Sequence, residues 1–195
     1  VFPLAIMFCC DLFNNRISGS SKDLARRLKV FLAGVLANTK GETVVVRDGE
    51  NSVAAELFRT LRTNIRFMQP KDVKCPVVLV TSSMNGEGKS YVATNLAVSM
   101  ALLGKKVALV GLDLRKPTLA KYLNLPSQGT MTNYLSDKAY TLEDVVVASS
   151  VKNLDVLPAG IVPPNPSELL QSDRLAVLFA ELRERYDYVV VDSAP

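Results

Sequence analysis

Residues 77–103 place an apolar run, a loop with two glycines and a helical pattern in direct succession, and this order most restricts the fold. The loop ends in Gly88, Lys89 and Ser90, which match the phosphate-binding pattern G-x-x-x-x-G-K-[ST], whereas Ser83 replaces its first glycine. Such a loop follows a strand and opens a helix, so that backbone N–H groups converge on one point. The stretch therefore predicts a strand–loop–helix unit of an α/β protein.

Three further apolar runs, at residues 107–110, 154–157 and 188–192, repeat the strand pattern. Each is continuous rather than alternating, which is typical of strands covered on both faces. Helical patterns at residues 165–171 and 172–186 lie between the last two runs. We expect an α/β fold with a mainly parallel sheet and helices on both faces.

A helical pattern also begins at residue 51, ahead of the first predicted strand. Its apolar residues recur every three or four positions, which predicts a stripe that faces the core. This stripe consists of Val53, Leu57, Leu61, Ile65 and Met68.

The glycine-containing loop has the groups that hold the β- and γ-phosphates of a nucleotide. Gly86 and Gly88 supply backbone freedom, Lys89 can reach the phosphate oxygens, and the Ser90 hydroxyl can bind Mg²⁺. An ordinary glycine-rich turn with a solvated lysine is the alternative. The residues predicted to bind the nucleotide are Ser83, Asn85, Gly86, Glu87, Gly88, Lys89, Ser90 and Tyr91.

Two aspartates follow predicted strands, Asp113 after residues 107–110 and Asp192 at the end of residues 188–192. The carboxyl ends of strands form the ligand crevice of open α/β sheets, so both acids can converge on the loop. Mg²⁺ uses one or two carboxylates and keeps several waters. We therefore predict a metal site formed by Ser90, Asp113 and Asp192.

The absence of histidine from all 195 residues excludes several kinds of catalytic site. A Ser-His-Asp triad, a histidine-paired cysteine and a histidine-rich metal site all require it. The three cysteines lack metal-ligand spacing, which fits a reducing compartment. The net charge of +4 is small and scattered, so we expect no nucleic-acid partner.

The chain opens with ten mostly apolar residues, whereas a helix that spans a bilayer needs about 20. Basic residues follow between positions 16 and 29, as expected where a membrane helix enters the cytoplasm. We assign residues 1–13 to the end of a transmembrane helix, with a buried strand or a peripheral apolar segment as alternatives. Residues 14–50 would be a juxtamembrane connector, and residues 51–195 a folded domain whose C-terminal continuation is missing.

Several runs together resemble the bacterial tyrosine kinases of exopolysaccharide and capsule synthesis, the BY-kinases. Residues 81–90 fit that family's Walker A form TSS-x-x-G-E-G-KS, and residues 192–195 fit its Walker B form D-x-x-P. The run PPNPSELL at residues 163–170 and an E-x-x-R-x-x-R run at residues 56–62 also match. The resemblance extends over about residues 40–195.

This resemblance implies a P-loop NTPase fold of the MinD/ParA type, as in division-site and partition ATPases. It implies transfer of the γ-phosphoryl group of ATP, with Mg²⁺, to tyrosines of a neighbouring subunit. Such transfer depends mainly on positioning and charge neutralisation, which requires no histidine. The implied catalytic residues are Lys89, Asp113 and Asp192.

The resemblance also implies partners. Glu56, Arg59 and Arg62 would mediate contact with a second copy of the chain, although a solvated helix face is the simpler alternative. Further implied partners are a membrane co-polymerase region and the polysaccharide export machinery. The expected location is the cytoplasmic side of the bacterial inner membrane.

Two departures from the family pattern leave the activity open. Gly111 occupies the first aspartate of the second motif, D-x-D-x-R, which removes a carboxylate that could bind metal or accept a proton. The family's tyrosine-rich tail is absent, and the six tyrosines present are dispersed. A catalytically weak, nucleotide-gated scaffold of the co-polymerase is therefore the alternative function.

A partition-type switch is disfavoured, because such proteins carry a lysine where this loop has Ser83 and Met84.

Overall fold

The described residues form a six-stranded sheet in the order β1-β2-β6-β3-β5-β4. The computed structural model describes residues 4–7, 31–36, 43–70, 72–125 and 130–195. All neighbouring strands are parallel except β4, which pairs with β5 in the antiparallel sense. The strands are β1 (Leu4–Met7), β2 (Val77–Thr81), β3 (Val107–Leu112), β4 (Val147–Ala148), β5 (Leu154–Leu157) and β6 (Tyr188–Ser193).

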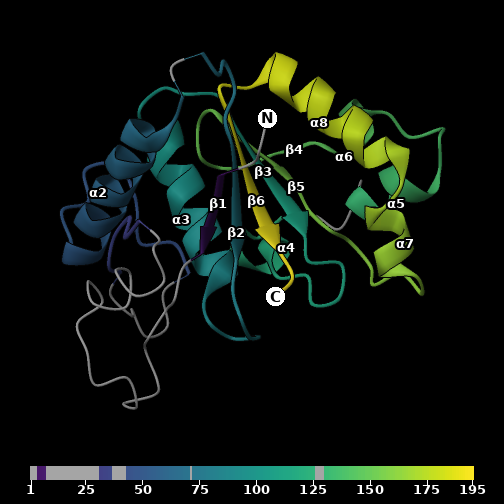
Figure 1. Cartoon of the computed structure of the whole chain (residues 1–195), viewed down its shortest axis with the longest axis horizontal. Coiled ribbons are helices and arrows are strands. Elements are labelled where there is room, and N and C mark those ends of the chain that lie inside the picture. The colour runs from purple at the N-terminus through teal and green to yellow at the C-terminus, as the bar shows by residue number, and fades with distance from the viewer. Residues whose placement is uncertain (1–3, 8–30, 37–42, 71, 126–129) are drawn as a thin grey trace.

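Helices cover both faces of this sheet, as predicted. The longer ones are α2 (Val53–Met68), α3 (Lys89–Ala101) and α8 (Asp173–Arg185), and the shorter ones are α4 (Leu119–Tyr122), α5 (Met131–Ser136), α6 (Leu142–Val145) and α7 (Pro166–Leu170). Helices α2 and α3 lie on one side, and α5 to α8 lie on the other (Figure 1). The α/β class and the mainly parallel sheet are therefore confirmed.

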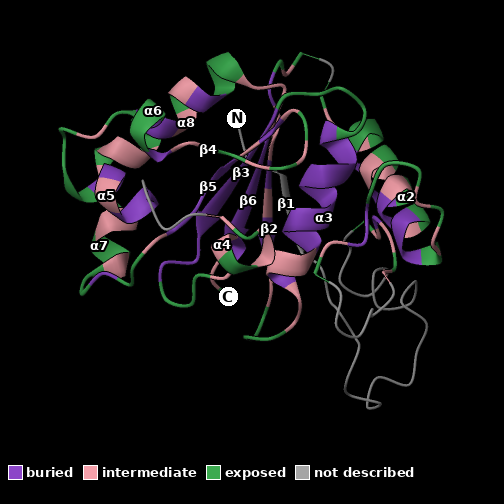
Figure 2. Ribbon diagram, turned by 180° about the vertical axis from the view of Figure 1, so that it is seen from behind, coloured by how far each residue is buried: buried purple, intermediate pink, exposed green. Residues whose placement is uncertain are grey.

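Strand β3 shows why the predicted strands read as continuous apolar runs. Val107 and Leu109 belong to the core beneath α2 and α3, whereas Ala108 and Val110 belong to the core beneath α5, α6 and α8. Every residue of β3 is buried, and so is most of α3 (Figure 2). Successive side chains of a strand point to opposite faces, so a strand covered on both sides needs no polar alternation.

Helix α2 confirms the predicted element but corrects its buried stripe. Leu61 and Ile65 are fully buried as expected, whereas Val53 at the first helical position is 75% exposed. The side chain that packs one turn before Leu61 is Phe58, which the predicted stripe omitted. Because 3.6 residues make a turn, steps of four rotate the stripe away from the core, and the observed spacing of three and four corrects that drift.

At the N-terminus, Leu4–Met7 match the strand that the sequence analysis kept as an alternative. These residues form strand β1, which pairs in parallel register with β2, rather than the end of a membrane helix. Pairing with the open edge of β2 satisfies backbone groups that a short isolated helix would leave unpaired. The other residues of 1–13 lie outside the described part of the chain. Within that part, no helix combines the length and apolar character needed to cross a bilayer.

Residues 43–46, predicted as connector, belong to the folded body. Asn95 on α3 accepts hydrogen bonds from the backbone N–H groups of Val45 and Val46, at 2.8 and 3.2 Å. Its side-chain amide also donates to the Thr43 carbonyl at 2.9 Å. Val45 and Val46 are buried in the core with α2 and α3. Residues 14–30 and 37–42 of the predicted connector lie outside the described residues.

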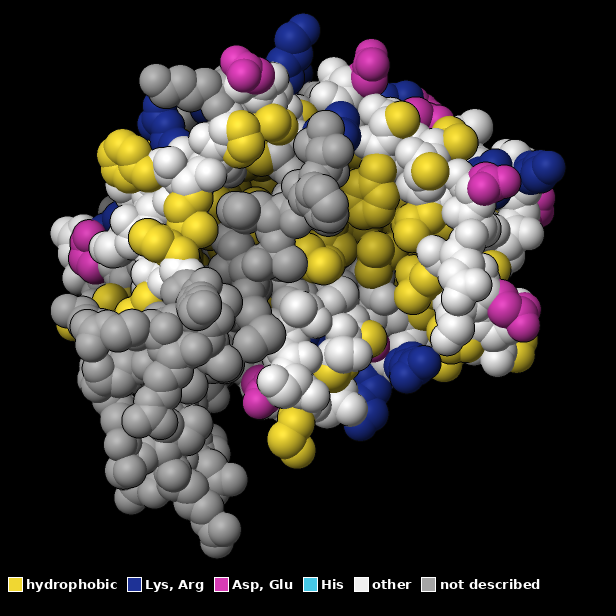
Figure 3. Space-filling view, in the orientation of Figure 1, with side chains coloured by type: hydrophobic (Ala, Val, Ile, Leu, Met, Phe, Trp, Pro, Cys, Tyr) yellow, Lys and Arg dark blue, Asp and Glu magenta, His cyan; other side chains and the backbone are white. Residues whose placement is uncertain are grey.

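The sheet face toward α8 is only partly covered. Hydrophobic side chains line a hollow between the middle of the molecule and α8 (Figure 3). Val77 and Leu79 of β2 and Phe179 of α8 are half-buried on this side. Strands β3 and β6, in contrast, are shielded on both faces, and their carboxyl ends support the site described next.

Candidate functional site

The loop between β2 and α3 has the backbone conformation that a phosphate-binding turn requires. Gly86 and Gly88 have φ angles of 85° and 89°, in the left-handed region that favours glycine. Gly88 is the N-cap of α3, so the helix begins at Lys89 and its first N–H groups open toward the loop. The predicted strand–loop–helix unit is present, and Asn85 lies exposed near the tip of the loop.

Glu87 braces the first half of the same loop. One carboxylate oxygen accepts hydrogen bonds from the N–H groups of Ser83 and Met84, at 2.9 and 3.0 Å. The carboxylate thus binds the entrance of the turn, where the usual pattern has glycine. In this arrangement the Ser83 N–H, which we predicted to face a phosphate, is already paired within the loop.

Ser90 connects the loop to the last strand. Its hydroxyl donates to Asp192 Oδ2 on β6 at 2.6 Å and accepts a hydrogen bond from the Thr118 hydroxyl at 2.7 Å. The sequence correctly placed Ser90 beside Asp192. The sequence analysis missed Thr118. Its only signal in the sequence was a hydroxyl-bearing residue at the end of the run Arg115-Lys116-Pro117-Thr118, which follows β3.

Asp192 has the properties expected of a cation ligand. Its side chain is almost fully buried, and Oδ1 has no hydrogen-bond partner among the described residues. Burial raises the pKa of Asp192 to about 6 against the opposing hydrogen bond from Ser90, and the charge of Asp113 adds to the rise. A bound cation would favour the charged carboxylate and satisfy the unpaired oxygen. These properties fit Mg²⁺.

Asp113 and Lys89 lie at the same edge of the sheet. Asp113 Oδ1 caps its own turn, accepting from the N–H groups of Arg115 and Lys116 at 3.2 and 2.9 Å. Both Asp113 and Lys89 are 8% exposed. A lysine buried to this extent needs an anionic neighbour, and Asp192 is close enough for the Lys89 charge to oppose the rise in the Asp192 pKa.

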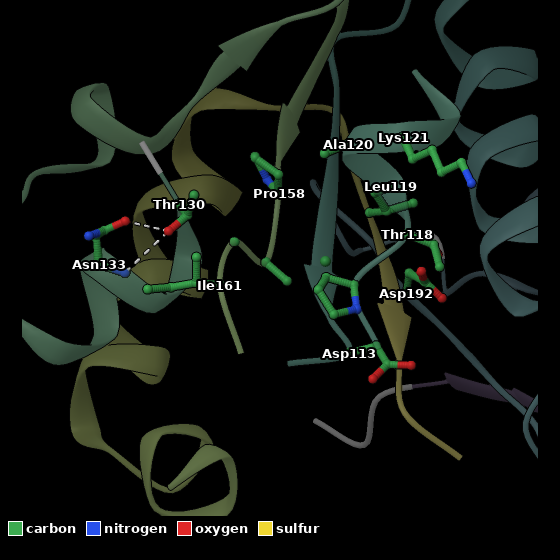
Figure 4. Close-up of a pocket in the computed structure, with 14 residues that line it drawn as sticks. Asp113, Thr118, Leu119, Ala120, Lys121, Thr130, Asn133, Pro158, Ile161 and Asp192 are labelled. Carbon is green, nitrogen blue, oxygen red and sulfur yellow. Dashed lines mark hydrogen bonds between the residues drawn. The ribbon is translucent and has the colours of Figure 1, made fainter. Parts of the chain in front are cut away.

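Beside the aspartates lies a pocket of about 470 Å³. Asp113, Asp192 and Thr118 stand on one side of it, and Thr130 and Asn133 stand across from them (Figure 4). Its apolar walls come from Leu119, Pro158, Ala159 and Ile161. The pocket is large enough for an aromatic ring, and it ends on carboxylates.

Gly111 forms part of the pocket wall and is tightly packed. It lies next to Asp192 in the register of β3 with β6. A Cβ added at Gly111 would lie 3.1 Å from the Ala159 backbone nitrogen and 3.2 Å from Leu119 Cδ1. At position 111, therefore, the carboxylate of the family pattern is absent, and Ala159 and Leu119 pack closely into the space that its side chain would need.

Tyr91, which we predicted to bind the nucleotide, directs its ring elsewhere. The ring packs edge-on against Phe58 of α2, with centroids 5.5 Å apart. The side chain thus faces the contact between α2 and α3. The backbone of Tyr91 lies in the first turn of α3, next to the loop.

The arginines of the E-x-x-R-x-x-R run contact other parts of the same chain. Arg62 donates to the Ser99 carbonyl at 2.6 Å and to the Ser99 hydroxyl at 3.0 Å, which joins α2 to α3. Arg59 pairs with Glu56 and donates to the Glu50 carbonyl. Arg62 therefore has a structural role within one chain, in addition to the predicted role between subunits.

Comparisons with known proteins show the family to which the chain belongs. The family described as AAA domain matches residues 76–195, which include the loop and both strand-end aspartates. The chain is 43% identical over 152 residues to the tyrosine-protein kinase YwqD of Bacillus subtilis (strain 168), which covers 78% of this chain and 63% of that protein. The chain thus spans less than two thirds of this curated relative.

Solved structures give the same relationship. The BceF tyrosine kinase domain has a TM-score of 0.77 and 31% identity, and the match covers 90% of this chain and 76% of that one. MinD of Pyrococcus horikoshii OT3, solved as a complex with Mg-ADP, has a TM-score of 0.53 and 24% identity over 60% of this chain and 48% of its own. The second match shows a shared MinD-like P-loop fold. On sequence, structure and motif together, the chain belongs to the AAA domain family and, within it, to the bacterial tyrosine kinases.

Proposed function

We propose that the chain binds ATP with Mg²⁺ and transfers the γ-phosphoryl group to tyrosine hydroxyls of a neighbouring subunit. The observation that carries this proposal is the contact of Ser90 with Asp192, directly beside a loop with two left-handed glycines. This contact would join the two halves of the proposed metal–phosphate site. The family relationship supports tyrosine as the acceptor.

The chain's own residues divide the work of this transfer. Lys89 and the N–H groups from Gly86 onward would hold the terminal phosphates, while Ser90 and Asp192 would hold Mg²⁺. The ion, when bound, neutralises charge on the phosphates. Hydrogen-bond donors that are already fixed in a partly buried site need little reorganisation during the reaction. This preorganisation is the main source of transition-state stabilisation available here.

The acceptor would approach through the pocket that ends on the aspartates. The phenol oxygen forms a bond to the γ-phosphorus, the bond from that phosphorus to the bridging oxygen breaks, and ADP leaves. The phenol proton passes to a carboxylate. Asp113, which lines the pocket, is the proposed base, and such help contributes about 10²–10⁴-fold to a rate.

The biological setting is also a proposal. The family resemblance supports a role in controlling exopolysaccharide or capsule chain synthesis and export. The proposed partners are further copies of the chain, a membrane co-polymerase region and the export machinery. The proposed location is the cytoplasmic side of the bacterial inner membrane.

A Lys89→Met substitution tests the kinase proposal. Loss of the ammonium removes the charge nearest the terminal phosphates, so phosphotyrosine formed from labelled ATP and Mg²⁺ should fall below detection. Lys105→Met is the matched control, because Lys105 is half-exposed beside Asp187 and outside the site. Equal labelling of the wild type and Lys89→Met would refute the proposal.

Gly111 favours one alternative function. It removes the first carboxylate of the second motif, and its surroundings are closely packed. A catalytically weak scaffold would change its assembly state with nucleotide but would form no phosphotyrosine. Light scattering with and without Mg-ATP, run beside the labelling assay on an acceptor-bearing partner, separates the two functions.

A further inference from the structure

The Thr118 hydroxyl is the third member of a chain of hydrogen bonds that ends on the buried carboxylate. It donates to Ser90 Oγ at 2.7 Å, and Ser90 in turn donates to Asp192 Oδ2 at 2.6 Å. Thr118 comes from the loop after β3, whereas Ser90 and Asp192 come from α3 and β6. The contact therefore ties a third segment to the proposed metal site.

The order of donors fixes the orientation of the Ser90 hydroxyl. A serine hydroxyl has one proton and two lone pairs. The proton points to Asp192, and the proton of Thr118 occupies one lone pair. The remaining lone pair is the one that can bind a cation, so its direction is set once the other two positions are filled.

The backbone holds Thr118 in place for this contact. Its carbonyl accepts from the Tyr122 N–H at 3.0 Å in the first turn of α4, and the next residue, Leu119, is 2% exposed. Pro117 precedes it and restricts the chain on that side. The hydroxyl is thus presented by an anchored turn.

We propose that Thr118 is a positioning residue for the metal: its hydroxyl orients Ser90 so that one lone pair of Ser90 stays directed at Mg²⁺. This inference rests on the proposed Mg-nucleotide site. Thr118 also lines the pocket proposed for the acceptor, but the inference concerns only its contact with Ser90 and assigns it no contact with nucleotide or ion. Its loss should therefore weaken the contribution of Mg²⁺ and leave metal-free nucleotide binding unchanged.

Calorimetric titration of the purified protein with ADP, in Mg²⁺ and in EDTA, tests the inference. Thr118→Val removes the donor and keeps the shape, so the affinity gained from Mg²⁺ should fall by about fivefold, the effect of one neutral hydrogen bond. Thr118→Ser should restore the gain, because it restores the hydroxyl. Should Thr118→Val fail to fold, Thr118→Ala serves in its place.

Thr94→Val is the matched control. It makes the same change in α3 at a buried hydroxyl that has no hydrogen-bond partner among the described residues, and it should leave the Mg²⁺ gain unchanged. A Mg²⁺ gain in Thr118→Val equal to that of the wild type overturns the inference alone. Failure of the wild type to bind ADP at all would instead overturn the proposed function.

Discussion

At the scale of single residues, a carboxylate holds the entrance of the loop, where the general phosphate-binding pattern has glycine. Glu87 accepts from two successive N–H groups at the entrance of the loop. Charge-assisted hydrogen bonds are stronger than neutral ones, and a turn held in its binding shape loses less entropy when a phosphate enters. Glu87 is thus a brace for the turn, although the sequence predicted it as a residue that contacts the nucleotide.

Removal of this brace should weaken nucleotide binding. Glu87→Ala frees two N–H groups and loosens the turn, so affinity for Mg-ADP should fall about tenfold, or ~1.4 kcal/mol. Glu87→Gln keeps an acceptor oxygen without the charge, so its affinity for Mg-ADP should lie between those of the wild type and Glu87→Ala. Calorimetry measures both, with the exposed acid Asp72 changed to alanine as a control. Tighter binding by Glu87→Ala would show instead that the carboxylate competes with phosphate.

An aspartate placed at position 111, as in the family pattern, should lower the stability of the protein as well as change its activity. Gly111→Asp places Cβ against Ala159 and Leu119, which should lower the free energy of unfolding by about 1–3 kcal/mol through overpacking. Gly111→Ala isolates the steric part, and Leu119→Ala added to Gly111→Asp removes the contact with Leu119 while the contact with the Ala159 backbone remains. Urea denaturation gives the stability, and phosphotyrosine labelling gives the activity. A fully stable Gly111→Asp protein would contradict this account of the packing.

At the scale of elements, Arg62 attaches α2 to α3, although the sequence analysis assigned this arginine to contact between subunits. Arg62 is half-buried and donates twice to Ser99, and burial is the main cause that lowers its pKa. A buried carbonyl that loses its donor costs more free energy than an exposed ion pair contributes. The two arginines of the same run should therefore behave differently when they are replaced.

Arg62→Ala should lower the free energy of unfolding by about 1–3 kcal/mol, whereas Arg59→Ala should change it by less than about 0.5 kcal/mol. Chemical denaturation measures both. Arg59→Glu is then the cleaner test of self-association, because the Arg59 ion pair with Glu56 is exposed and only its contact with the Glu50 carbonyl is partly buried. If Arg59→Glu leaves the light-scattering mass of an assembling protein unchanged, the subunit-contact proposal for this run is wrong.

At the scale of the whole molecule, local patterns predicted the strands well and long-range contacts poorly. Residues 77–81 and 154–157 form strands with the predicted bounds, because continuous apolar runs between turns leave few alternatives. The edge strand β1 was only an alternative in the sequence analysis, since a short apolar run has the same composition in a strand and in a helix. Hydrophobic periodicity also says nothing about hydrogen bonds between distant segments, which explains why Thr118 and the structural role of Arg62 were missed.

The position of β6 has a consequence for how the protein is made. Strand β6 lies between β2 and β3, and its Asp192 is 102 positions after the Ser90 that it contacts. While the ribosome is still translating the region before β6, the strands on either side of it lack the neighbour that joins them. The binding site is therefore complete only after β6 has been translated, and a nascent polypeptide that stops short of β6 holds an unjoined half of the binding site.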